Sequence, residues 1–232
     1  MNKQEWVKLL KTDVKMFNET REEMIDLSRA DLSHANLRRA NLRGASLSRA
    51  DLSDVDLRRA NLRGANLSYV DLRHADLSYA DLSYADLRNA DLSRANLRNV
   101  DLRNVNLRNV DLRNADLSYA NLRNADLSYA NLRNANLRNV NLRNVDLRNA
   151  DLSYADLRNA DFDFSSFPLW CGSFNFKADM RLVYQLCYHI CRLNIINQNG
   201  KESKTGKILQ KLLMPYANKF HRTEECGLIK EN

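Results

Sequence analysis

The chain has 232 residues, of which 44% are hydrophobic and 28% charged, a composition typical of a folded protein with one or two domains. No stretch approaches the ~20 consecutive apolar residues of a membrane span, and charges run through the N-terminal segment, so we expect neither a membrane protein nor a secretory signal. Four cysteines in such a chain are typical of free thiols in a reducing compartment, which predicts a cytoplasmic protein.

The net charge of +7 is unevenly distributed. Residues 1–24 carry five basic and five acidic side chains. Residues 25–167 carry 21 Arg and 19 acidic side chains, a net charge of +2, and residues 168–232 carry ten basic and five acidic side chains, a net charge of +5. The basic character therefore belongs mainly to the C-terminal segment.

Residues 1–24 are predicted to form an N-terminal capping helix. Val7, Leu10, Val14 and Phe17 share one face of a helix over residues 3–23. A cap is expected because the repeats that follow would otherwise expose apolar side chains and unpaired strand edges at their open end.

Residues 25–167 repeat with a period of five. Leucine recurs at every fifth position from Leu27 to Leu157, 27 times without a miss, and Phe162 and Phe167 continue the register. Ala or Val nearly always stands two residues before each leucine, and Asp or Asn directly before it. On a helix, successive leucines would lie about 140° apart, and on a strand they would alternate between faces. The chain must instead turn once in each repeat, so that four repeats close a square coil of twenty residues.

The leucines are therefore predicted to fill the interior of a stack of coils that are ~4.8 Å apart. Residues 25–167 give about seven coils on this spacing. A filled interior leaves no pocket, and the sequence has no P-loop, Rossmann glycine pattern, nucleophile elbow or HExxH motif. We therefore predict a non-enzyme without catalytic residues or cofactors. The predicted structural core includes Leu27, Leu32, Leu37, Leu42, Leu97, Leu157, Phe162 and Phe167.

The repeating unit, A-(D/N)-L-(S/R)-X, closely resembles that of the pentapeptide-repeat family. The resemblance covers more than half of the chain and implies a β fold, a right-handed quadrilateral β-helix. It also raises DNA mimicry as a function, because the gyrase-protecting members of the family are usually described as DNA mimics. A mimic needs dense negative charge along its length, which the nearly neutral coils disfavour.

The predicted faces differ in charge. The face around Leu32 to Leu152 holds seven acidic side chains and four Arg, a net charge of −3, whereas the next face, around Leu37 to Leu157, holds seven Arg and four Asp, a net charge of +3. We favour the interpretation that the Asp and Asn side chains form hydrogen bonds with the turns and that Arg side chains from adjacent coils screen the Asp charges. The acidic column consists of Asp31, Asp51, Asp71, Asp91, Asp111 and Asp151.

Two groups of metal-ligand side chains stand out. His34, Asp54 and His74 occupy one column in successive coils, about 4.8 Å apart, a set that is chemically suited to Zn²⁺. Cys187 and Cys191 lie four residues apart on one predicted helix face, but the C-x₂-C spacing of structural zinc sites is absent. We predict no metal site, with the column exposed at the corners and the cysteines buried as small apolar residues.

Residues 168–232 are predicted to form an α-helical C-terminal cap or interaction region. The stretches LWCGSF, QLCYHICRL and ANKFHRTEECG are similar to the tails of pentapeptide-repeat proteins from Gram-positive bacteria and their phages. Lys204, Lys207 and Lys211, in and beside the second predicted helix, are candidate interaction residues. A solvated face is the favoured interpretation, and contact with nucleic-acid phosphates is the alternative.

The sequence as a whole predicts a structural, protein-binding scaffold with an unknown partner. The alternatives are a gyrase-interacting DNA mimic and nucleic-acid contact through the basic tail. The C-terminal helices are also candidates for pairing two chains into a homodimer, as the C-terminal regions of similar proteins do.

Overall fold

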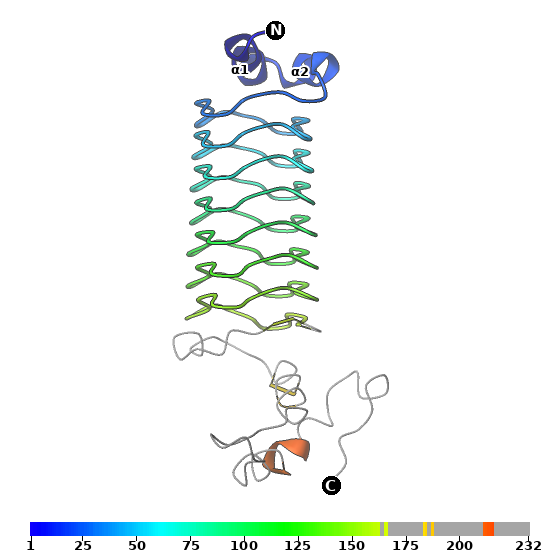
Figure 1. The fold of residues 1–232 in the computed structure, drawn as a ribbon, viewed down its shortest axis with the longest axis vertical. Coiled ribbons are helices and arrows are strands. Elements are labelled where there is room, and N and C mark those ends of the chain that lie inside the picture. Colours follow the sequence, from blue (N-terminus) through cyan, green and yellow to red (C-terminus); the bar gives the residue numbers. More distant parts are fainter. Residues whose placement is uncertain (163–164, 167–182, 185–186, 188–210, 216–232) are drawn as a thin grey trace, which may run out of the picture. The chain divides into compact units, whose positions relative to one another are not determined.

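The computed structural model describes residues 1–162, 165–166, 183–184, 187 and 211–215. The chain divides into two compact units, Met1–Lys177 and Ala178–Asn232. The first unit contains helix α1 (Lys3–Thr12), helix α2 (Val14–Thr20) and the repeats (Figure 1). In the second unit, residues 183–184, 187 and 211–215 are helical. None of the helices in these described segments is long and apolar enough to cross a membrane.

Two short helices stand where the sequence predicts one, so the prediction of a continuous helix over residues 3–23 is wrong. The break lies at Asp13, which ends α1 by donating its backbone N–H to the Leu9 carbonyl at 2.8 Å. The Asp13 carboxylate then accepts the Met16 N–H at 2.9 Å, as the N-cap of α2. Trp6 and Phe17, one from each helix, are buried and pack edge to face with ring centroids 5.7 Å apart.

The repeats form a stack of coils with a period of twenty residues, as the sequence predicts. Parallel bridges join each residue that precedes a leucine to the residue twenty positions later, from Asp26–Ser46 to Asp146–Ser166. A turn follows every five residues and the bridges repeat every twenty, so each coil has four sides. Figure 1 shows the resulting stack of coils from the side. The predicted right-handedness and number of coils stay predictions.

Each repeat can pair all five of its backbone N–H groups. Two donate to the following coil and one to the preceding coil. The fourth closes the turn onto the leucine carbonyl, and the fifth is accepted by the side-chain oxygen of the Asp or Asn before the leucine. Residues 56–60 show the whole set, with donor–acceptor distances of 2.7–3.2 Å. The Asp or Asn is favoured at this position because the N–H two residues later has no other partner in the ladder.

The second residue after each leucine has a left-handed backbone. Its φ lies between 55° and 62° in the non-glycine cases and is 66° at Gly44 and Gly64. A positive φ at the second central position is the requirement of a type II turn, which favours Asn and Gly. This explains why Asn is so frequent there.

The leucines form the core. Every one from Leu27 to Leu157 is at most 1% exposed, and Phe162 is 3% exposed, whereas Phe167 lies outside the described residues. The gap between the leucines from Leu82 to Leu117 has no room for a water molecule. The interior of this stretch is therefore closed to ligands.

Candidate interaction surface

Functional side chains on the repeats stand at three outward positions: the residue before each leucine and the two after it. We number the four faces by their leucines. The first face runs from Leu27 to Leu147, the second from Leu32 to Leu152, the third from Leu37 to Leu157 and the fourth from Leu42 to Phe162. Because the ladder fixes every coil to the next, each outward position forms a column with a step of ~4.8 Å.

Arg and Asp of the same repeat form ion pairs on all four faces. At Asp146, for example, Arg148 donates from Nε at 3.0 Å and from Nη2 at 2.6 Å. These bonds, together with those from the Arg148 backbone and Ser166, lower the pKa of Asp146 to about 2 against the opposing effect of burial. Hydrogen bonds from Arg58 and Arg73 likewise lower the pKa of Asp56 and Asp71. Much of the acidic charge is thus neutralised within the surface.

The acidic column of the second face is compensated in part, since four of its six carboxylates have a basic partner. Arg73 lies 2.6 Å from Asp71 and 4.0 Å from Asp91, and Arg113 lies 2.6 Å from Asp111. Lys11 lies 3.8 Å from Asp31, whereas Asp51 and Asp151 keep their charge and accept hydrogen bonds from the serine two residues later. The column is therefore not the dense free negative charge that imitation of a polyanion requires.

The candidate metal column lies at three corners of the second face. His34 Nδ1 and Asp54 Oδ2 are 4.0 Å apart, and their side chains are 76% and 48% exposed. Across the described ranges, no group of three His, Cys, Asp or Glu side chains is placed to hold a metal ion.

The tyrosines that end some repeats are exposed and spread over all four faces, so they form no continuous stacking platform. Four of them lie under the guanidinium of an arginine in the preceding coil, with distances of 5.1–5.9 Å to the ring centroid. These contacts were not predicted from the sequence. Their signal is an arginine twenty or twenty-one residues before a tyrosine, as in Arg49 and Tyr69 or Arg63 and Tyr84.

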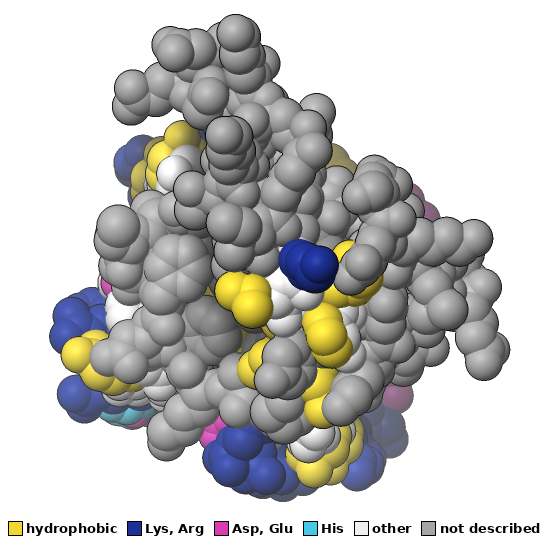
Figure 2. Space-filling view, turned by 90° about the horizontal axis from the view of Figure 1, so that it is seen from below, with side chains coloured by type: hydrophobic (Ala, Val, Ile, Leu, Met, Phe, Trp, Pro, Cys, Tyr) yellow, Lys and Arg dark blue, Asp and Glu magenta, His cyan; other side chains and the backbone are white. Residues whose placement is uncertain are grey.

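Basic side chains stand out on more than one side of the molecule in the axial view of Figure 2. Of the tail lysines, Lys211 is exposed and begins the described helical stretch, while Lys204 and Lys207 lie outside the described residues. Cys187 is buried, and burial raises the pKa of its thiol. Cys191 lies outside the described residues, so its predicted position on the same helix face as Cys187 stays a prediction. The predicted dimer contact stays a prediction too.

Comparison with protein families gives one clear result. The protein-family model described as pentapeptide repeats matches residues 25–64, 56–94, 90–128 and 125–163 of the sequence. No curated protein matches the chain.

Among solved structures, the chain is similar to HetL, a pentapeptide repeat protein involved in heterocyst differentiation regulation in the cyanobacterium Nostoc sp. strain PCC 7120. The two are 35% identical over 68% of this chain and 83% of HetL, with a TM-score of 0.45. The chain is also similar to QnrB1, a plasmid-mediated fluoroquinolone resistance protein, at 24% identity over 75% of this chain and 89% of that one, with a TM-score of 0.51.

Proposed function

This chain belongs to the pentapeptide-repeat family, and on that premise we propose that it is a non-enzymatic scaffold whose outer faces bind a protein partner. The observation that carries the proposal is the closed leucine interior, which leaves only the outer faces for binding a partner. Each outward side chain stands on a backbone whose N–H groups are paired with the neighbouring coils or within the repeat, so the surface is ordered before it binds. A preordered surface loses little entropy on association.

In this proposal the scaffold is a right-handed β-helix of about seven coils, counted on the twenty-residue period. Helices α1 and α2 close its first coil. Three polar side chains of the helical segment reach that coil's open edge: Lys3 Nζ donates to the Ser28 carbonyl at 3.0 Å, Arg21 Nη2 to the Arg43 carbonyl at 2.8 Å, and Asn18 accepts the Asn41 N–H at 2.7 Å. These backbone groups would pair with a preceding coil if there were one.

The gyrase-directed mimic is the weaker candidate because four of the six carboxylates of the acidic column have a basic partner. A supercoiling assay separates the two readings. We expect no inhibition of gyrase at micromolar protein, and inhibition that salt abolishes would favour the mimic.

The scaffold proposal is tested with four variants, each of which carries a photo-crosslinking amino acid at one of the four corners of a single coil. We expect covalent adducts with a host protein from one face or two adjacent faces. Equal labelling from all four positions, or none, would contradict a defined interaction surface. The four positions have the same left-handed backbone and are Asn89, Arg94, Asn99 and Asn104.

A further inference from the structure

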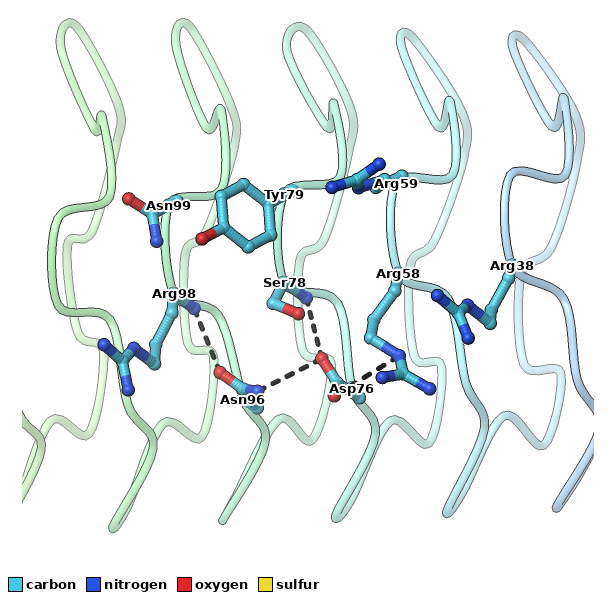
Figure 3. Close-up of a pocket in the computed structure, with 9 residues that line it drawn as sticks. All are labelled: Arg38, Arg58, Arg59, Asp76, Ser78, Tyr79, Asn96, Arg98 and Asn99. Atoms are coloured by element: carbon cyan, nitrogen blue, oxygen red, sulfur yellow. Dashed lines mark hydrogen bonds and ion pairs between the residues drawn. The ribbon is translucent and has the colours of Figure 1, made fainter.

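A depression of about 550 Å³ lies on the third face around Ser78 (Figure 3). It exists because the position after leucine carries an arginine in the coils on both sides, Arg58 and Arg98, and a short serine between them. Ser78 is 7% exposed at the floor, and Tyr79, which is 60% exposed, stands beside it. The shape follows from a short side chain between two long ones, a pattern that Ser118, between Arg98 and Arg138, repeats two coils later in the same column.

The basic excess of the third face is concentrated around this depression. In its first four coils, residues 35–99, the face carries five arginines and two aspartates, a net charge of +3. In the remaining three coils the third face carries two arginines and two aspartates, a net charge of zero. The arginines of the first group are Arg38, Arg39, Arg58, Arg59 and Arg98.

Several guanidinium groups here keep donors for a ligand. Arg58 spends its Nε and one Nη2 hydrogen on Asp56, which leaves three of its five N–H donors. Arg98 approaches Asp116 at 3.9 Å without a hydrogen bond, and its side chain is 53% exposed. Arg59 lies over Tyr79 at 5.9 Å and forms no ion pair with any residue of the described coils.

The single carboxylate in the depression, Asp76, is outnumbered by the arginines that line it. Asp76 Oδ1 accepts the Ser78 N–H at 2.9 Å and Asn96 Nδ2 at 3.1 Å, and Arg58 Nε lies 3.8 Å from its other oxygen (Figure 3). These contacts hold Asp76 at the floor, and the four arginines that line the depression outnumber this one carboxylate and set the sign of the potential.

We propose that this depression binds the carboxylate side chains of an acidic segment of a protein partner, an inference that rests on the proposed scaffold function. Planar guanidinium groups suit bidentate capture of carboxylates. A nucleic acid fits less well, because the excess positive charge ends after four coils and the tyrosines give no continuous platform for bases.

The test measures binding of a fluorescent ten-residue polyglutamate peptide by anisotropy at low and at physiological salt. In one variant, Arg59→Gln and Arg98→Gln remove two guanidinium groups of the depression. In the matched control, Arg123→Gln and Arg143→Gln remove two from the fourth face, where neither forms an ion pair in the described coils. We expect the Kd for the peptide to rise about tenfold in the first variant and to change less than about twofold in the control.

Equal weakening in both variants, or no binding of the peptide by the intact protein, would overturn the inference. A ten-nucleotide single-stranded DNA serves as a second probe. If it binds more tightly than polyglutamate and loses affinity with Arg59→Gln and Arg98→Gln, the depression binds phosphate and the acidic-protein assignment is wrong. Circular dichroism of each variant checks that the coils remain folded.

The crosslinking experiment separates failure of this inference from failure of the scaffold proposal. If Asn99 labels a partner and labelling persists when Arg59 and Arg98 are glutamine, the scaffold proposal stands and the depression is not its site. If no face labels a partner, the scaffold proposal fails, while the peptide titration still decides whether the depression binds carboxylates.

Discussion

The corner residue of each repeat carries most of the backbone strain in the solenoid. Asparagine and glycine adopt a positive φ readily, but the same position also holds Arg, His and Tyr with φ near 60°. Side chains that branch at Cβ tolerate this conformation least. The corner is therefore a position where one substitution changes stability without touching the core.

We expect Asn114→Val, at φ 58°, to lower the free energy of unfolding by about 1–2 kcal/mol. Urea denaturation followed by circular dichroism measures the change. The control is Arg94→Asn in the coil before, at φ 61°, which should leave stability unchanged or raise it slightly. If valine is tolerated as well as asparagine, the left-handed corner does not limit stability.

The ion pairs within repeats predict a specific pH dependence. The folded pKa of Asp146 is about 2, below the usual value near 3.9, so this carboxylate stabilises the fold above pH ~4, and the contribution is lost as pH falls towards 2. Asp146→Asn keeps an oxygen for the Arg148 N–H but loses the ion pair. We expect its urea midpoint to lie below that of the native protein at pH 7 and to converge with it near pH 2.

The reciprocal change provides the control. Asn141 accepts the Arg143 N–H at 3.1 Å and has no carboxylate to offer its guanidinium. Asn141→Asp should therefore gain stability at pH 7 relative to pH 2. If both variants shift in the same direction at both pH values, the ion pairs do not govern the acid sensitivity.

At the scale of elements, Asn18 is the residue through which α2 meets the first coil. Its side chain accepts the Asn41 N–H at 2.7 Å and donates to the Arg39 carbonyl at 3.0 Å. We expect Asn18→Ala to cost about 1–3 kcal/mol, because it leaves the partly buried Asn41 N–H without its partner. Hydrogen exchange of the first coil should accelerate with it. Glu19→Ala, at an exposed position of the same helix, is the control and should change stability by less than about 0.5 kcal/mol.

The period of five was sufficient to predict the coils, because a strict leucine repeat can face inward only if the chain turns once in each unit. The same reasoning missed the helix break, although Asp13 carries an N-cap signal that the search for one apolar face passed over. The depression was also partly predictable: sorting the sequence by twenty places two serines, Ser78 and Ser118, between arginines of one column. Its volume and the pairing of Asp76 depend on side-chain conformations that periodicity does not specify.

The whole solenoid behaves as a one-dimensional stack in which each coil contacts its two neighbours. Its stability should therefore depend on register more than on the identity of any coil. Deleting residues 101–120 removes twenty positions, one full coil, and returns every later residue to its original column. We expect this variant to keep its sheet signal in circular dichroism, with a lower urea midpoint, and to bind polyglutamate as the intact protein does, since the depression lies within residues 38–99.

Deleting residues 101–104 is the matched control, because it removes far fewer residues yet moves every later leucine out of its inward position. Coils beyond the deletion would then turn polar side chains inward and leucines outward, which costs far more than the loss of one coil. We expect this shorter deletion to lose the cooperative unfolding transition, or to retain only the part before residue 101. If instead it is as stable as the twenty-residue deletion, the inward leucine column does not hold the stack together, and the rigid outer faces on which partner binding depends lose their physical basis.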